Sequence, residues 1–467
     1  MTRRRHRARA AWWCGALAAL CAIGAGRARA QEPEPTPSPS PSPAEESEER
    51  STGLPHGLDW TFNLDASWGS FGFANSLYRD SKPDQPSGDL SDNWFEGSVK
   101  PALTGTWTGA NGSQAYGMVS AVGERTYGAA PSVAGEDASS FQAEDLHLGW
   151  RSGNAFEGLG ENALELTFGR ARYELGHGLL LWDGAAEGGH RGGYWTNARK
   201  AFELAAIVRF KPHHHTLEAF YLDKDDLPEA DTGSRVWGAN YEYAIGEDTT
   251  LGATYMKWYA HPEEAPQRDG LDVFNLRAYT APFAGLTGLS FELEYAREAN
   301  GDVLDSFAWN AQAAYQWGGG WKPKLSYRYA FFEGDDPETP ADETFDPLSP
   351  GFHDWGTWWQ GEIAGEYFVS NSNLVSHQVR LHVDPTEAVG AGLIGYSFRL
   401  DEPSAAGPEV TSRDVAFELD GYLDWKINDN FSASVVAAFA DPGAAIQQLS
   451  GRTKSFTYGM VYLAYSY

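Results

Sequence analysis

In several segments of this sequence, basic side chains alternate with apolar ones, and this spacing predicts binding of anionic groups. Lys324 and Arg328 share one parity, while Leu325, Tyr327 and Tyr329 share the other. A strand with this alternation has one apolar and one wet face, and a guanidinium on a wet face binds carboxylates or phosphates through charge-assisted hydrogen bonds. These residues therefore predict a charged strand face that can select solutes by their charge. The candidates are Arg170, Arg199, Arg209, Arg277, Lys324, Arg328, Arg380 and Arg399.

Catalytic and cofactor-binding signatures do not occur in the sequence. It has no G-x-S-x-G, P-loop, H-E-x-x-H or EF-hand pattern. The histidines at 213–215 could contact a metal, but their position in a predicted tight turn favours a solvated turn. We predict no cofactor, no metal site and no enzymatic activity. A weak Ca²⁺ contact is the less favoured reading of one acidic loop group, which comprises Asp335, Asp336, Asp342, Glu343 and Asp346.

The elements that must position the basic residues are β-strands. Near the start of the pattern, Leu58, Trp60 and Phe62 alternate with Asp59 and Thr61. No amphipathic helix pattern of useful length lies between such segments, so the sequence predicts an all-β fold. The predicted strands lie near residues 58–71, 94–105, 114–124, 141–151, 162–172, 201–211, 215–223, 235–245, 249–259, 271–280, 288–299, 305–317, 321–332, 373–384, 388–400, 412–426, 430–440 and 455–467.

The connections between the predicted strands alternate between short and long. Short turns on one side and long loops on the other are typical of an outer-membrane β-barrel. A β-sandwich gives no reason for connection lengths to alternate. A propeller would show a repeated blade signature, and the sequence shows none. We therefore predict a transmembrane antiparallel barrel of about 18 strands. The tight turns lie at 211–215, 246–248, 318–320, 384–387 and 428–430, and the long loops at 72–93, 125–140, 173–200, 224–234, 260–270, 333–372, 401–411 and 441–454.

The ends of the chain agree with export to the outer membrane. Residues 1–30 begin with arginines, continue with an apolar stretch and end in Ala28-Arg29-Ala30, which predicts a signal peptide cleaved near Ala30. The only cysteines, Cys14 and Cys21, lie within it. Residues 31–52 are rich in Glu, Pro and Ser and predict a disordered periplasmic segment. Residues 53–467 then form the barrel, whose last predicted strand ends on an aromatic residue.

The charge balance limits the possible partners. The chain has 64 acidic against 35 basic residues, a formal net charge of −29, which excludes nucleic acid. The expected partners are outer-membrane lipid, a hydrophilic or polysaccharide cargo and periplasmic export proteins, and we expect a monomer. Carboxylates on the inward parity predict an acidic sector of the wall that faces the basic sector. The favoured role of this acidic sector is to hydrate the lumen. Its carboxylates are Asp59, Asp65, Glu418, Asp420 and Asp424.

Several short segments resemble the alginate export family of outer-membrane proteins. They are residues 345–348 (Phe-Asp-Pro-Leu), residues 355–362 (Trp-Gly-Thr-Trp-Trp-Gln-Gly-Glu), residues 372–374 (Ser-Asn-Leu), and residues 168–170 (Phe-Gly-Arg) followed by Trp195, Asn197 and Arg199. The resemblance implies an eighteen-stranded barrel and passive secretion of alginate through an arginine-rich constriction. The excess of acidic residues in this chain departs from that pattern, so the resemblance supports the fold more strongly than it supports the cargo.

The sequence as a whole predicts a passive outer-membrane channel for a hydrophilic solute, with export of an anionic polysaccharide as the family-based expectation. We expect Arg170, Arg199, Arg328 and Arg380 to set a positive potential at a constriction narrowed by the loops at 173–200 and 333–372. The carboxylate excess favours the alternative of a non-specific or cation-preferring porin. A third alternative is an outer-membrane scaffold or enzyme whose loops plug the lumen.

Overall fold

The computed structural model describes residues 57–77, 91–109, 111–128, 130–131, 137–283, 285–286, 288–351, 360–407 and 409–467. The predicted signal peptide and periplasmic segment lie outside the described residues, as do Trp355, Trp358 and Trp359 of the family-like segment. No helix among the described residues is long and apolar enough to cross a membrane.

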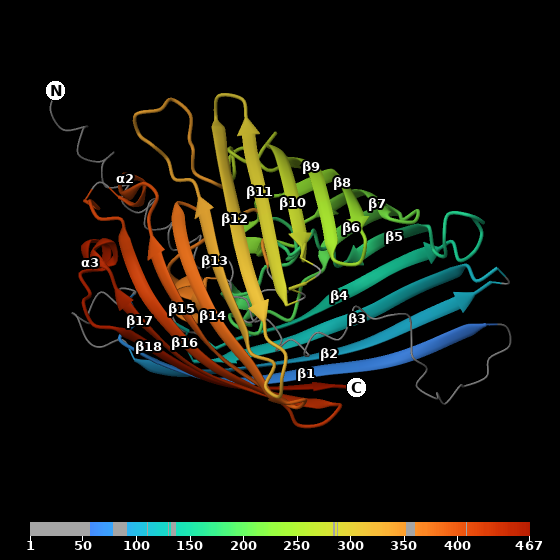
Figure 1. The fold of residues 1–467 in the computed structure, drawn as a ribbon, viewed down its shortest axis with the longest axis horizontal. Helices are drawn as coiled ribbons and strands as arrows, with labels where there is room; N and C mark the ends of the chain where they lie inside the picture. The colour runs from blue at the N-terminus through green and yellow to red at the C-terminus, as the bar shows by residue number, and fades with distance from the viewer. Residues whose placement is uncertain are drawn as a thin grey trace.

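Eighteen antiparallel strands pair in chain order and close into a barrel (Figure 1), as the sequence predicts. The closure joins β1 to β18, with Asp65 opposite Ser466 and Ala74 opposite Thr457. This pairing leaves no free sheet edge. The strands are β1 (Leu58–Ala74), β2 (Asp92–Thr108), β3 (Gln114–Tyr127), β4 (Ala138–Arg151), β5 (Leu164–Ala171), β6 (Phe202–Phe210), β7 (His215–Asp223), β8 (Arg235–Ile245), β9 (Thr249–Tyr259), β10 (Asp272–Thr280), β11 (Leu289–Asn300), β12 (Leu304–Gln316), β13 (Lys324–Phe332), β14 (Leu374–Thr386), β15 (Val389–Arg399), β16 (Asp414–Lys426), β17 (Phe431–Pro442) and β18 (Phe456–Ser466).

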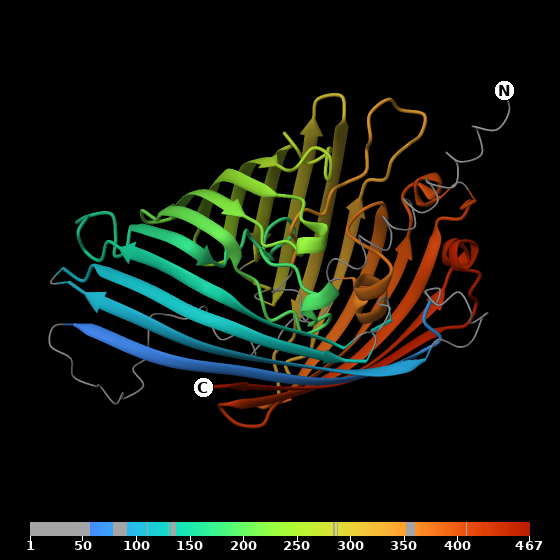
Figure 2. The ribbon, with the colours of Figure 1, turned by 180° about the vertical axis from the view of Figure 1, so that it is seen from behind.

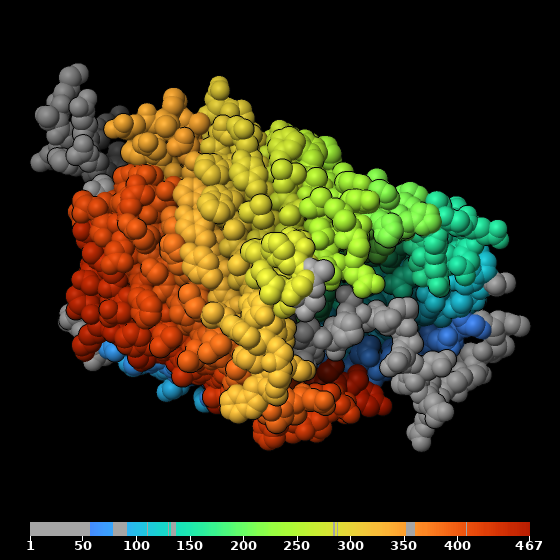
Figure 3. Space-filling view, in the orientation of Figure 1, coloured from blue at the N-terminus to red at the C-terminus, as the bar shows by residue number. Residues whose placement is uncertain are grey.

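The two faces of each strand differ in the way that a membrane barrel requires. On β10, Phe274 and Leu276 are 52% and 58% exposed, whereas Asn275 and Arg277 are 1% and 3% exposed. Outward side chains of other strands are exposed too, for example Leu293 at 50% and Leu419 at 45%, and Figure 3 shows the outer surface of the wall that the strands form. The period of two therefore places the apolar parity towards lipid and the polar parity towards the lumen.

The predicted alternation of short and long connections is confirmed, with two exceptions. The connection between β11 and β12, on the side of the long loops, is a three-residue turn at 301–303. The connection between β4 and β5, on the opposite side, spans residues 152–163. Short helical segments occur only within connections among the described residues: η1 (Gly189–Arg191), η2 (Pro228–Ala230), η3 (Gly361–Gly365), α2 (Pro403–Ala406) and α3 (Ala444–Ser450).

Described segments of two long loops fold into the barrel. They are loop 172–201, between β5 and β6, and loop 333–373, between β13 and β14. In Figures 1 and 2 their green and orange segments lie within the ring of strands. The backbones of the two loops are hydrogen-bonded to each other. Trp182 N–H donates to Ser349 O at 2.9 Å, and Gly351 N–H donates to Gly178 O at 2.7 Å. Together they build a core inside the barrel.

Candidate functional site

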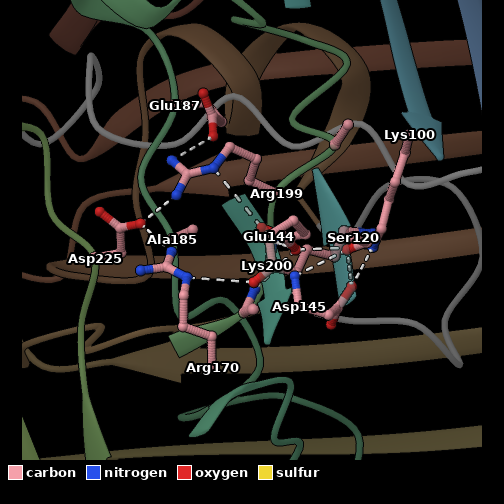
Figure 4. Close-up of polar contacts among 12 residues, drawn as sticks. Lys100, Ser120, Glu144, Asp145, Arg170, Ala185, Glu187, Arg199, Lys200 and Asp225 are labelled. Carbon is pink, nitrogen blue, oxygen red and sulfur yellow. Dashed lines mark hydrogen bonds and ion pairs between the residues drawn. The ribbon is translucent and has the colours of Figure 1, made fainter. Parts of the chain in front are cut away.

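Three arginines converge on the carboxylate of Asp225, in the connection between β7 and β8. Arg191 Nη2 lies 3.0 Å from Asp225 Oδ1, and the Nη2 atoms of Arg170 and Arg199 both donate to Asp225 Oδ2. Figure 4 shows Arg170 and Arg199 approaching Asp225 from different sides. This cluster joins the end of β5 to loop 172–201 and brings together Arg170 and Arg199, two of the four arginines expected from the sequence at one constriction.

The cluster is compensated by further carboxylates. Arg199 is fully buried; its Nη1 lies 3.2 Å from Glu187 Oε1 and its Nε lies 3.7 Å from Glu144 Oε2. Burial alone would raise the pKa of Asp225, but Arg199 and its two neighbouring arginines hold that pKa below its ordinary value. Burial, and then the nearby Glu124 carboxylate, raise the pKa of Glu187, which favours its uncharged form and weakens its compensation of Arg199. The positive potential expected from Arg170 and Arg199 is therefore reduced mainly by Asp225 and Glu144.

Carboxylates on three consecutive strands hold the backbone of loop 172–201. Glu96 on β2 accepts hydrogen bonds from the backbone N–H groups of Trp195 and Thr196 at 3.0 and 2.8 Å. Glu124 on β3 accepts from Ala198 N–H at 3.1 Å. Glu144 on β4 accepts from Lys200 and Ala201 N–H at 2.7 and 3.1 Å. A buried N–H group without a partner is costly, so these glutamates specify the inward position of the loop.

Carboxylates of β16 hold loop 333–373 in the same way. The two oxygens of Glu418 each accept one backbone N–H, from Ile363 and Ala364, both at 2.7 Å. Asp420 accepts from Glu362 N–H at 3.2 Å. The expectation that Glu418 and Asp420 hydrate the lumen is wrong, because both are fully buried beneath η3. The acidic sector on β16 and β1 also lies beside the basic sector of β13–β15 and not opposite it.

Trp195 connects the two loops to each other and to the wall. Its indole Nε1 donates to Glu362 Oε1 at 3.0 Å. Its ring packs against Phe71 of β1 and Tyr462 of β18, with centroid distances of 5.2 and 5.1 Å. The loops therefore form one plug, which is anchored to the wall by backbone capture and by aromatic packing.

The tip of loop 172–201 reaches β10 and β11. The His177 ring stacks on Tyr279 at a centroid distance of 3.9 Å, and His177 Nδ1 lies 3.4 Å from Glu292 Oε2. Next to it, Arg277 Nη2 donates to Glu242 Oε1 at 3.0 Å. Because the loop leaves β5 and reaches β10, it crosses the lumen and narrows it.

A second basic group lies across the lumen, on β13 and β14. Arg328 is 1% exposed and interacts electrostatically with Arg380, Tyr396 and Glu292. Arg380 is half-buried, and its Nε and Nη2 donate to the hydroxyl of Tyr422 at 3.0 and 2.7 Å. The strands pair in chain order around the barrel, so these two arginines lie on a different wall from the Asp225 cluster. The four arginines expected at one constriction therefore form two separate groups.

The remaining candidates differ in their placement. Arg209 faces the lumen, and its Nε donates to Glu218 Oε1 at 2.6 Å. Lys324 has the inward parity but is exposed at the start of β13. The inward prediction for Arg399 is wrong, because it is exposed on the outward parity of β15. The cause is that Tyr396 and Phe398 turn inward to pack on the loop core, which reverses the usual apolar parity.

The less favoured metal readings gain no support. Within the described ranges, no group of three or more His, Asp or Glu side chains is arranged to hold a metal ion. Arg268 Nε donates to Asp346 Oδ2 at 2.8 Å. The carboxylates of Asp335 and Asp342 accept backbone N–H groups of Glu343 and Thr344 at 3.3 and 2.8 Å, as ordinary loop carboxylates do.

Sequence reasoning missed Asp225 and the capturing glutamates. The alternation in the sequence could have identified Glu96, Glu124 and Glu144 as inward-facing, because each has the inward parity of its strand. What each carboxylate binds depends on loops that are far away in the chain, and no local pattern reports that.

The closed eighteen-stranded fold, with a polar lumen narrowed by two loops, is that of an outer-membrane β-barrel channel. The chain belongs to the alginate export family, whose model matches residues 109–459. OccAB2 of Acinetobacter baumannii is similar in structure, with a TM-score of 0.56, 13% identity and coverage of 87% of this chain and 98% of that one. OccK11 (OpdR) of Pseudomonas aeruginosa has a TM-score of 0.54 and 14% identity, with coverage of 88% and 98%. At such identities the likeness shows the fold. No curated protein sequence matches the chain.

Proposed function

We propose that this protein is a monomeric channel that exports an anionic, alginate-like polysaccharide passively, with the cargo moving along the wall formed by β13 and β14. Residues 1–30 act as a signal peptide and residues 31–52 as a periplasmic segment. Neither a nucleotide-binding motif nor a catalytic motif occurs in the sequence, so the cargo gradient or a periplasmic export protein supplies the driving force.

One observation carries the choice of an anionic cargo. Arg328 and Arg380 lie on adjacent strands with inward parity, and Arg380 donates to a neutral phenol. Arg328 and Arg380 are near enough to interact electrostatically, and two guanidinium groups on one stretch of the pore wall attract a carboxylate of the cargo. Family membership supports the same cargo class.

A cation-preferring porin is the second candidate. It is favoured by the excess of acidic residues and by Asp384 and Asp424, which flank the Arg380 site on β14 and β16. Closely spaced carboxylates on a pore wall attract cations.

Reversal potentials in a KCl gradient across planar bilayers separate these functions. We expect anion preference in the wild type, loss of that preference in the Arg328→Gln/Arg380→Gln double variant, and no change in Arg399→Gln, whose side chain faces outward. Oligouronates should block the current more strongly than neutral dextrans of matched length.

The alternatives predict different outcomes. Cation preference that is unchanged in the double variant would establish the porin. Persistent electrical silence of folded protein would support a plugged scaffold.

A further inference from the structure

Glu124 of β3 and Glu187 of loop 172–201 form a carboxyl pair in the interior of the plug. The two side chains lie within hydrogen-bonding reach of each other, and the residues are only 3% and 5% exposed. Glu124 Oε1 accepts from Ala198 N–H at 3.1 Å, and Glu187 Oε1 lies 3.2 Å from Arg199 Nη1, as Figure 4 shows for Glu187. One oxygen of each carboxyl group therefore has a donor.

The second oxygen of each carboxyl group has no donor. Glu124 Oε2 and Glu187 Oε2 are both buried, and no hydrogen-bond donor among the described residues reaches either atom. An ionised carboxylate can only accept hydrogen bonds, and two carboxylates in contact repel each other so strongly that one of them takes up a proton. A single proton turns one of these oxygens into a donor, and the other oxygen accepts from it.

The neighbouring Glu96 of β2 shows what an ionised carboxylate needs in the same interior. Its Oε1 accepts from Trp94 Nε1 at 2.9 Å. Its Oε2 accepts from the backbone N–H groups of Trp195 and Thr196 and from the Thr196 hydroxyl, at 3.0, 2.8 and 3.1 Å. Four donors surround this one carboxylate, whereas two donors from the described part of the chain serve the whole carboxyl pair.

We propose that Glu124 and Glu187 share one proton, and that this proton locks loop 172–201 onto β3 and keeps the plug closed. With the proton in place, the pair is a hydrogen bond between the wall and the loop. Without the proton, two negative charges meet in a buried site and repel each other. The loop therefore leaves the lumen more readily as the pH rises. That its departure opens a passage rests on the proposed channel.

The charged groups that face the pair or its neighbouring arginines come from four elements. They are Glu96 of β2, Glu144 of β4, Arg191 and Arg199 of loop 172–201, and Asp225 of the connection between β7 and β8. The two arginines favour ionisation of Glu187, but both are bound to Asp225. Burial, and then the Glu124 carboxylate, outweigh them and raise the pKa of Glu187.

The raised pKa of Glu187 determines the direction of the pH effect. A carboxyl group of this kind stabilises the docked loop fully below its ordinary pKa of 4.5. As the pH rises from there to the raised pKa, the docking equilibrium weakens by about tenfold for each pH unit. Above the raised pKa the equilibrium does not weaken further.

Hydrogen exchange of the captured backbone tests the shared proton without conduction. In detergent-solubilised protein, the protection factors of the amides of residues 195–201 should be at least about tenfold lower at about pH 9 than at about pH 6. Glu187→Gln should remove this fall, because its amide keeps an acceptor for Arg199 and gives Glu124 a donor that does not titrate. Glu96→Gln is the matched contrast: its amide turns N–H towards N–H, so protection should be low at both pH values.

An exposed control shows whether the effect is local. Glu203→Gln, near the start of β6, should keep the full pH response of the wild type. An equal fall in the wild type and in Glu187→Gln would overturn the shared proton. Low protection of Glu187→Gln at both pH values would overturn it as well, because a cation held between two ionised carboxylates predicts that result.

Single-channel recording separates the lock from the proposed function. The mean current of the wild type should rise between about pH 6 and about pH 9 by more than that of Glu187→Gln. An equal rise in the two conducting proteins would overturn the lock and leave the channel intact. Absence of conduction in both would overturn the proposed channel, while the exchange experiment would still test the shared proton.

Discussion

Trp195 of loop 172–201 donates its indole N–H to Glu362 of loop 333–373 across 3.0 Å, and both side chains are buried. This bond joins two loops that leave the barrel wall at opposite sides, β5 and β13. The lumen is therefore narrowed by one two-loop plug and not by two independent loops.

Replacement of Trp195 by Phe should loosen this plug. The aromatic packing on Phe71 and Tyr462 would remain, but Glu362 would lose its donor, at a cost of about 1–3 kcal/mol. We expect a larger and noisier single-channel current and a lower unfolding temperature in detergent. Trp237→Phe is the control, because Trp237 is 43% exposed on the outer face of β8. Equal currents in both variants would show that the indole bond does not couple the loops.

Neutralising Asp225 should release loop 172–201. Arg170, Arg191 and Arg199 all bind this one carboxylate, and loss of one member of a buried ion cluster costs about 3–5 kcal/mol. We expect Asp225→Asn to unfold at a lower temperature and to prefer anions more strongly, because three guanidinium groups lose their counter-charge. Asp231→Asn, an exposed change in the same connection, should leave both properties unaltered. A stable Asp225→Asn variant with wild-type selectivity would contradict the anchoring role.

Docking of loop 333–373 should weaken as the pH rises. Burial, and then the carboxylates of Glu366 and Asp420, raise the pKa of Glu362 well above its ordinary value of 4.5. A carboxyl group whose pKa is raised on folding stabilises the folded state fully below its unfolded pKa, and this stabilisation is lost as the pH rises through the folded pKa. The protection factors of the amides of residues 361–367, which correct for the base catalysis of intrinsic exchange, should therefore be larger at about pH 6 than at about pH 9.

Glu362→Gln should remove this pH dependence. The amide oxygen can still accept the bond from Trp195, but the side chain carries no charge at any pH. Glu338→Gln, an exposed substitution in the same loop, should behave like the wild type. If the protection factors in Glu362→Gln still fell at high pH by the wild-type factor, another group would be responsible.

Gly361 should tolerate no side chain. Its φ of +87° favours glycine, and a Cβ there would lie 2.5 Å from Glu418 Oε1, the atom that accepts from Ile363. Gly246, in the turn after β8, has a φ of +66° with open space around the Cβ position. Alanine at Gly246 should cost about 1 kcal/mol, and alanine at Gly361 distinctly more. Thermal unfolding of the two variants, followed by gel mobility, compares the costs directly.

The strand layout follows from the sequence alone, because the side-chain parity of a strand is a local property. The alternation in residues 235–245 and 249–259 predicts the bounds of β8 and β9 without error, and Arg277 and Arg328 take their predicted inward positions. The long connections that interrupt the alternation are also visible as local composition.

The tertiary structure decided where the charges are paired. Loop 172–201 crosses to β10, which places Asp225 between Arg170 and Arg199 and neutralises arginines that local sequence presents as free. The same inward fold buries Tyr396 on the lumen side of β15, and this reverses the parity from which Arg399 was predicted to line the pore. Both outcomes depend on contacts between segments that are distant in the chain, and such contacts leave no periodic signal in the sequence.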